Sequence, residues 1–200
     1  MGRQMERFGP TLRGGPLFRW LGEHLAVDLA NTVMVVREGE EVDLLGSPED
    51  LERWLDAERS RLGAVPDFAK HLDEVRAFRD AVREVLMAAA DGRAPRADAV
   101  EGVNAASLAD PLAPQLEASS GGALRALEHT PARDPATRVL ATLARSAIGL
   151  VTSRESEWLQ VCSAPSCGMF FIGRRRWCCA ACGNRARAAR HYRRAREPTA

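Results

Sequence analysis

The sequence predicts an α+β fold that is predominantly helical, with a few short strands and a small cysteine-rich module at its C-terminal end. Two observations predict this fold class. Long segments of the first 158 residues place apolar side chains at the 3.6-residue spacing of an amphipathic helix. All five cysteines lie between Cys162 and Cys182, in a segment too short to build a hydrophobic core of its own.

We therefore expect three parts in the chain. Residues 1–16 are rich in Gly, Pro and Arg and predict a mobile lead-in. Residues 17–158 are expected to form the helical domain, and residues 159–200 the cysteine-rich module. No flexible linker separates these last two parts, so we expect the module to be held at a defined angle to the body.

The segment from Leu17 to Leu45 carries mixed signals. We expect a short strand near Phe18, a helix over roughly 24–36 and an extended piece from Val42 to Leu45. The helix rests on its apolar spacing, although the residues from Val33 to Val36 are typical of a strand.

Helix boundaries are clearer in the next segment. Ser47 can cap a helix that has Pro48 in its first turn and ends near Gly63. The following helix begins after Pro66 and stops at Gly92. Its apolar stripe consists of Phe68, Leu72, Val75, Phe78, Val82, Val85, Leu86 and Ala89.

Three further elements complete the body. A shorter helix is expected over 97–107 and a turn at Gly121-Gly122. The segment from Leu124 to Glu128 can form either a short strand or one helical turn. Asp134-Pro135 opens the longest helix, which is expected to run toward Trp158.

The composition argues against a membrane protein. Apolar residues make up 46% of the chain and charged residues 28%, as in ordinary soluble proteins. No apolar run approaches the roughly 18 residues of a membrane span. The first ten residues lack the apolar core of a secretory signal. We expect a cytoplasmic protein with reduced thiols and no membrane partner.

The net charge of +1 hides an asymmetry. Residues 151–200 contain ten Arg and three Glu, a net charge of +7, which leaves 18 basic and 24 acidic residues, a net charge of −6, in residues 1–150. A basic tail on an acidic body predicts that the tail meets a polyanion and that the body does not.

The cysteine spacing predicts a zinc site. Cys162, Cys167, Cys178 and Cys182 can supply the four thiolates of a tetrahedral structural zinc. Metal binding would then supply on the order of 10 kcal/mol of folding free energy. Cys179 is left over. The spacing alone also allows Cys179 to replace Cys178, or to serve as the resolving thiol of a redox switch.

Between the two cysteine pairs we expect a hairpin. A strand over Met169–Ile172 turns at Gly173 and returns over Arg175–Trp177. Gly168 follows a ligand, at a position where the backbone often needs a positive φ. With Cys182 opening the next helix, the module is expected to be a small treble-clef-like zinc finger.

A basic helix is expected after Cys182, because Ala and Arg are strong helix formers. Asn184 and Arg185 lie within one turn of the zinc and are expected to brace the zinc fold. The other arginines and a tyrosine indicate a nucleic-acid-binding surface. Docking of this helix on the acidic body, or on an acidic protein partner, is the alternative. The expected contact residues are Arg174, Arg175, Arg176, Arg187, Arg190, Tyr192, Arg193 and Arg194.

The body shows no catalytic pattern. Asp28, Asn31 and Thr32 fall on one helical face, where they could line a small-molecule pocket or anchor the helix to neighbouring backbone. We favour the anchoring role. No His-Glu-x-x-His motif and no Gly-rich phosphate loop occurs, so we do not expect an enzyme.

The C-terminal motif resembles a known family. Trp177-Cys178, followed by Cys182-Gly183-Asn184-Arg185 and the Ala- and Arg-rich tail, resembles the CGNR zinc finger. The upstream region resembles the ABATE domain that usually precedes this finger. The residues that carry this second resemblance are Leu25 to Thr32, Asp43-Leu44-Leu45, Leu51, Trp54-Leu55 and the helix from Asp134 to Leu150.

The resemblance covers roughly residues 17–196 and implies a stress-induced bacterial transcription regulator that binds zinc and DNA. In relatives, the residue after the first cysteine of the second pair is typically small and polar. The resemblance therefore favours Cys178 and Cys182 as the ligands and leaves Cys179 as a substitution.

We therefore expect a zinc-dependent DNA-binding transcriptional regulator whose body serves for dimerisation or for sensing a small-molecule effector. One finger offers a contact area near the low end of roughly 600–1,000 Å², so tight binding to duplex DNA would require a homodimer. The alternatives are an RNA-binding or protein-interaction zinc module and a thiol-based redox sensor.

Overall fold

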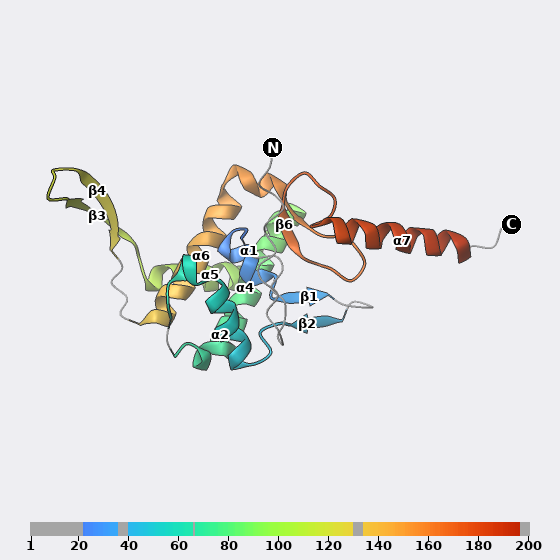
Figure 1. The fold of residues 1–200 in the computed structure, drawn as a ribbon, viewed down its shortest axis with the longest axis horizontal. Helices are drawn as coiled ribbons and strands as arrows, with labels where there is room; N and C mark the ends of the chain where they lie inside the picture. The colour runs from blue at the N-terminus through green and yellow to red at the C-terminus, as the bar shows by residue number, and fades with distance from the viewer. Residues whose placement is uncertain (1–21, 36–39, 66, 130–133, 197–200) are drawn as a thin grey trace.

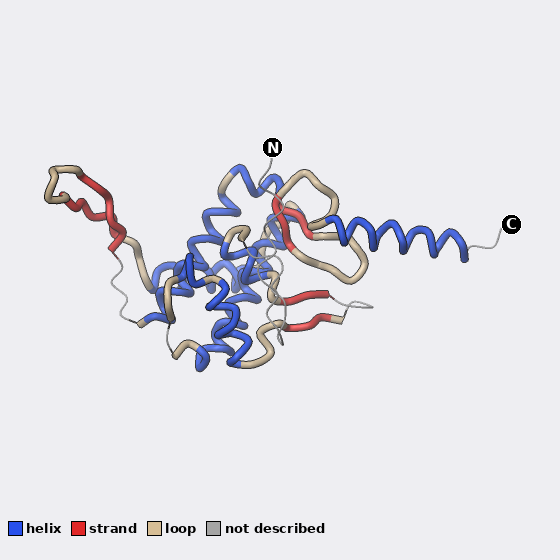
Figure 2. Tube along the Cα trace, viewed as in Figure 1, coloured by secondary structure: helices blue, strands red, loops and turns tan. Residues whose placement is uncertain are grey.

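The predicted fold class is confirmed by the computed structural model, in which helices predominate (Figures 1 and 2). The described strands form three separate two-stranded antiparallel sheets. The expected lead-in over residues 1–16 and the expected strand near Phe18 lie outside the described residues. The structure describes residues 22–35, 40–65, 67–129 and 134–196.

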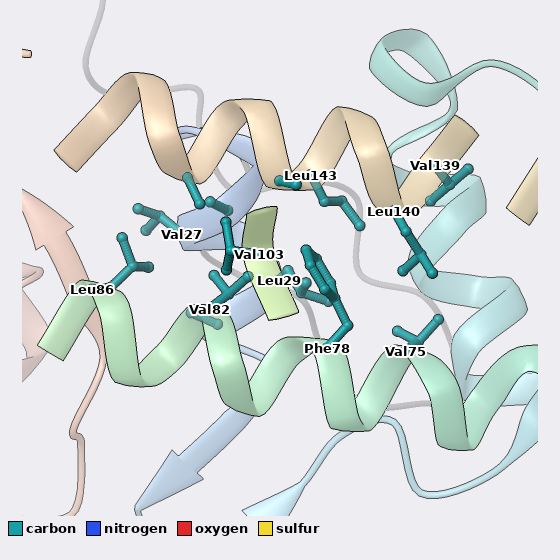
Figure 3. Close-up of a cluster of buried hydrophobic side chains, with 14 of the residues drawn as sticks. Val27, Leu29, Val75, Phe78, Val82, Leu86, Val103, Val139, Leu140 and Leu143 are labelled. Atoms are coloured by element: carbon teal, nitrogen blue, oxygen red, sulfur yellow. The ribbon is translucent and has the colours of Figure 1, made fainter. Parts of the chain in front are cut away.

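The core of the body lies between three long helices and one short one. α4 (Leu72–Asp91), α5 (Ala97–Ala109) and α6 (Pro135–Thr152) pack together with α1 (Leu25–Ala30). Figure 3 shows α4 and α6 facing each other across side chains from α1 and α5. The predicted stripe of α4 is buried there, as expected for an amphipathic helix. Its buried members are Val75, Phe78, Val82, Val85 and Leu86.

The predicted capping residues act at the helix ends. The hydroxyl of Ser47 accepts a hydrogen bond from the backbone N–H of Asp50 at 3.3 Å and begins α2 (Pro48–Ala57). The carboxylate of Asp134 accepts one from the backbone N–H of Thr137 at 3.0 Å and begins α6. Gly92 ends α4 with φ at 66°, a left-handed conformation that favours glycine.

The helix expected to end near Gly63 is interrupted at Glu58. The short α3 (Arg59–Leu62) continues it to Gly63. A 3₁₀ turn, η2 (Ala69–His71), precedes α4.

The expected helix over 24–36 is wrong beyond Ala30. The chain turns after α1 and enters β1 (Val33–Val35), which pairs with β2 (Glu41–Asp43) so that Val33 lies opposite Asp43. The expected extended piece at Val42–Leu45 overlaps β2. β-branched valines favour a strand once a partner strand is present. The local apolar spacing does not show that β2 will be that partner.

The segment from Leu124 to Glu128, left open above, is a strand. β3 (Ala113–Ala118) and β4 (Leu124–His129) form a hairpin that projects from the body at the end opposite to α7 (Figure 1). The predicted turn at Gly121-Gly122 joins them, with φ of Gly122 at 79°.

The long helix α6 stops at Thr152 and does not run on to Trp158. A 3₁₀ helix, η3 (Arg154–Trp158), and a strand, β5 (Leu159–Val161), carry the chain to Cys162. Ser153 ends α6, since its hydroxyl bonds back to Leu150 and caps η3.

The expected hairpin after Gly168 is also wrong. β6 (Phe170–Ile172) forms, but it pairs with β5 and not with residues 175–177. Leu159 and Phe170 both belong to the core of the body, so pairing β6 with β5 buries both. The expected return segment begins with two arginines, Arg175 and Arg176, and their charges would be unpaired in that core.

α7 (Ala180–Arg196) begins two residues before Cys182, so Cys182 lies in its first turn and does not open it. The helix extends away from the helical body (Figure 1). Among the described residues, no helix is both long and apolar enough to cross a membrane.

Candidate metal centre and basic helix

Four sulfur atoms converge where β5, β6 and α7 meet. The Sγ atoms of Cys162, Cys167, Cys178 and Cys182 all lie within 4.8 Å of one another. The Sγ of Cys178 is 3.4 Å from that of Cys182 and 3.6 Å from that of Cys167. The first two cysteines frame a loop after β5, and the last two flank the start of α7.

This spacing fits a four-thiolate metal ion. A tetrahedral zinc with Zn–S bonds of about 2.3 Å places its sulfurs roughly 3.8 Å apart, close to the observed separations. The backbone N–H of Cys178 points at the Sγ of Cys162 at 3.4 Å, a donor that stabilises a thiolate. Two ligands from a loop and two from a helix start are also the arrangement expected of a treble clef.

The thiols of this cluster share hydrogen bonds. The hydrogen bond from Cys178 lowers the pKa of Cys167 to about 5, and the same bond raises the pKa of Cys178. Burial, aided by the charge on Cys167, raises the pKa of Cys182 to about 12. A divalent cation would replace these shared protons, because ligand cysteines bind as thiolates.

Cys179 lies outside the group of four. Its thiol is half-buried and packs at the edge of the cluster. The four converging sulfurs are therefore those that the spacing and the family resemblance favour, with Cys178 in place of its neighbour.

Arg185 contacts the cysteine cluster, whereas the side chain of Asn184 contacts only another residue of α7 among the described residues. The Nη2 atom of Arg185 donates to the Sγ of Cys182 at 3.0 Å. A guanidinium group here offsets part of the negative charge of four thiolates around a divalent ion. The side-chain oxygen of Asn184 accepts from Arg187 one turn along α7.

The loop between the cysteines is fastened to the body. Asn31 donates to the backbone carbonyl of Phe170 at 3.0 Å and accepts from its N–H at 2.8 Å. The backbone N–H of Val35 donates to the carbonyl of Cys167 at 3.2 Å. Gly168 has φ at 66°, and a Cβ there would lie 2.6 Å from Val35. The candidate ligand Cys167 is thus joined to β1 by a backbone hydrogen bond.

The three arginines before Cys178 lie against aromatic rings. The guanidinium carbon of Arg174 is 3.8 Å from the ring centre of Trp158, and that of Arg175 is 5.3 Å from Phe171. Arg176 lies over Trp177 at 5.6 Å. These cation–π contacts hold the loop in place but leave the guanidinium edges able to donate.

The predicted contact residues of α7 are exposed. Tyr192 has 69% of its side chain accessible and meets His191 edge to face. Arg187, Arg190, Arg193 and Arg194 are exposed as well. The structure therefore brings Arg176, Arg190 and Arg193 together beside the cysteine cluster, whereas Arg175 lies near Glu23 of the body.

Asp28 lies in α1, Asn31 and Thr32 lie in the turn that follows it, and all three are buried. Asn31 holds Phe170, and the hydroxyl of Thr32 donates to the carbonyl of Leu29 at 2.7 Å. Asp28 forms an ion pair with Arg61. Burial raises the pKa of Asp28 to about 7, aided by the negative charge of the buried Glu58 and opposed by the hydrogen bond from Arg61. These partners match the anchoring role and account for the polarity of this face.

Sequence reasoning missed two groups of residues. Val35 was assigned to a helix, although its backbone N–H bonds the loop from Cys162 to Phe170, here called the metal loop, at Cys167. Trp177, Ala186 and Ala189 line a groove beside the arginines, and small residues in a helix give no signal of such a role. Gly168 was the one local hint of a close approach in this region.

Comparison with known families gives two matches. Residues 23–154 match the ABATE family, described as "Putative stress-induced transcription regulator". Residues 159–195 match the CGNR zinc finger. No curated protein sequence matches this chain.

Proposed function

Since this chain belongs to the ABATE family and carries a CGNR zinc finger, we propose that it is a zinc-dependent transcriptional regulator that binds duplex DNA. In this proposal, zinc fixes α7 to the rest of the finger and the arginines of α7 contact the DNA. The body holds the finger in a set orientation.

The pairing of arginines carries the proposal. In the body, most arginines have a carboxylate partner, among them Arg53, Arg59, Arg61, Arg76, Arg79, Arg83, Arg93, Arg96 and Arg125. Within the described residues, no carboxylate partner is present for Arg176 or for four arginines of α7, Arg187, Arg190, Arg193 and Arg194. Arg185 contacts Cys182 instead.

Unpaired arginines on a projecting helix suit a polyanionic ligand. Each can neutralise a phosphate without first breaking an internal ion pair, and guanidinium groups bind phosphate and guanine in a forked geometry. The same arrangement speaks against docking of α7 on the acidic body, because the helix extends away from it (Figure 1).

Zinc would have a structural role. Cys162, Cys167, Cys178 and Cys182 would hold the ion, and the closed set of four thiolates leaves no open position for catalysis. The ion would join the loop that contacts the body to the first turn of α7. Zinc binding would then fix the positions of the α7 arginines relative to the body.

Salt-dependent binding is the direct test. The zinc-loaded protein is titrated into labelled genomic duplex fragments, and anisotropy is followed between about 50 and 200 mM salt, where several phosphate contacts cost orders of magnitude in affinity. We expect salt-sensitive binding that is lost with a chelator. Preference for RNA or for an acidic polypeptide in competition would point to the alternative functions, and absence of binding would remove the proposal.

We further propose that the body transmits its state to the finger through Asn31 and Val35, the two residues that join it to the metal loop. Self-association of the body would bring a second finger to the DNA, since the contact area of one finger is small. Light scattering of the zinc-loaded protein with and without duplex DNA measures the self-association, and a monomer in both states would refute the dimer.

A further inference from the structure

A groove of about 460 Å³ lies beside the metal cluster. One wall is the loop between the first two cysteine ligands, a second is the loop before Cys178, and the third is α7. The residues that line it are Ser163, Pro165, Arg176, Trp177, Ala186, Ala189, Arg190 and Arg193.

The groove combines a cationic rim with an apolar floor. Arg176, Arg190 and Arg193 bring three guanidinium groups to it, and no acidic residue lines it. Ala186 and Ala189 are half-buried and small, so they leave room over the helix surface. A nucleic-acid backbone has the complementary pattern, because its charged phosphates alternate with largely apolar sugars.

The arginines of α7 differ in whether they line the groove. With about 100° between successive residues, Arg190 and Arg193 lie on the same side as Ala186 and Ala189. Arg187 and Arg194 do not line the groove, and they lie about 60° and about 40° around the helix from Arg190. Of the predicted contact arginines of α7, Arg190 and Arg193 therefore line the groove, and Arg187 and Arg194 lie beside it.

We propose that this groove binds one phosphodiester unit of the DNA backbone, with the phosphate between the guanidinium groups of Arg176 and Arg193 and the sugar over Ala189. Arg187 and Arg194 then face a different part of the duplex. The inference rests on the proposed DNA binding and assigns the backbone contact within it.

The position of the groove gives it a specific effect. All three walls are joined through the cysteine ligands, so the groove has this shape only while the cluster is intact. A phosphate held there fixes the angle at which α7 meets the duplex, because backbone contacts set register and orientation.

A pair of charge-neutral substitutions on α7 tests the groove. Ala189→Leu fills it, whereas Ala188→Leu adds the same bulk on the far side of the helix, where Ala188 is exposed. We expect Ala189→Leu to weaken duplex binding about tenfold, the loss of one charge-assisted contact, and Ala188→Leu to leave it unchanged. Metal content and helical circular dichroism confirm that both variants are folded.

Arg193→Ala gives an independent measurement. It should reduce the salt slope of binding by about one and weaken all duplex sequences alike, as a phosphate contact does. In the Ala189→Leu background it should have little further effect, because both changes act on one site.

The outcomes separate the inference from the proposal that it rests on. Wild-type protein that binds duplex DNA while Ala189→Leu and Ala188→Leu bind equally well would overturn the groove and leave DNA binding intact. Additive effects of Ala189→Leu and Arg193→Ala would also overturn it. Wild-type protein that binds no duplex would refute both.

Discussion

The two halves of the finger differ in what holds them in place. The half formed by β5, the cysteine loop and β6 is built into the body, with Phe170 in its core at 1% exposure and bonded to Asn31. The other half, α7, extends away from the body and contributes Cys182 to the group of four sulfurs (Figure 1). The finger thus contains one part that packs in the body and one part that projects from it.

This difference predicts different costs for changes in the two halves. Changes to the anchored half should affect the free energy of unfolding, and changes to α7 should affect nucleic-acid binding alone. The metal cluster lies between them and should affect both. Four substitutions test this division, from the largest expected effect to the smallest.

Cys182→Ser should have the largest effect. It removes the ligand that ties α7 to the cluster, and zinc binding contributes on the order of 10 kcal/mol in small zinc modules. We expect loss of bound metal, loss of helical signal from α7 and loss of DNA binding, while the body keeps its own unfolding transition. Cys179→Ser is the matched control and should keep one metal ion, as measured by elemental analysis. A full equivalent of metal in Cys182→Ser would contradict the assignment of the ligands.

Asn31→Ala should destabilise the protein by about 2–4 kcal/mol. The substitution leaves the buried N–H and C=O of Phe170 without their side-chain partners. Urea unfolding measures the change, and zinc affinity should fall with it because the metal loop loses its attachment. Asn104→Ala, at an exposed position of α5, serves as the control and should change neither. Equal stability of the two variants would show that the loop does not depend on the body.

Gly168→Ala should cost about 2 kcal/mol, from a left-handed conformation and from a close approach to Val35. Gly122→Ala separates the two terms, because Gly122 has a similar φ of 79° and nothing within 4 Å of its Cβ position. We expect that control to cost about 1 kcal/mol. Adding Val35→Ala to Gly168→Ala should restore part of the stability that Gly168→Ala loses beyond Gly122→Ala. Thermal unfolding of the wild type, the two glycine variants and the double variant measures this, and no recovery in the double variant would show that contact with Val35 is not the cause.

Arg194→Ala should change the free energy of unfolding by less than about 0.5 kcal/mol, the usual range for exposed positions. Its guanidinium has no ion-pair partner among the described residues, so the folded state loses no contact. DNA affinity should nevertheless fall. A large drop in melting temperature would mean that α7 packs on another part of the protein in solution.

The long elements were predictable from the sequence because their signals are local. The stripe of α4, the caps at Ser47 and Asp134, and the stop at Gly92 each depend on residues within a few turns. The cysteine spacing was equally informative, since four thiolates at such intervals have few other structural roles. The structure brings those four sulfurs together.

The short elements were not predictable, because distant residues decide them. The residues from Val33 to Val35 fit a helix or a strand locally, and pairing with β2 together with the bond to Cys167 selects the strand. β6 pairs with β5 because both contribute to the core of the body, a fact that local alternation does not contain. The groove beside α7 was missed for the same reason, since its walls come from three separate segments.

The bond between Asn31 and Phe170 has a consequence for protein engineering. The boundary between the two family matches falls near residue 155, which suggests that the finger could be cut out and fused to another protein. A finger removed there would expose Leu159 and Phe170, two residues of the body's core, and would lose the amide that holds its metal loop. A graft of this finger therefore has to carry α1 and β1 with it, or replace them with a designed surface.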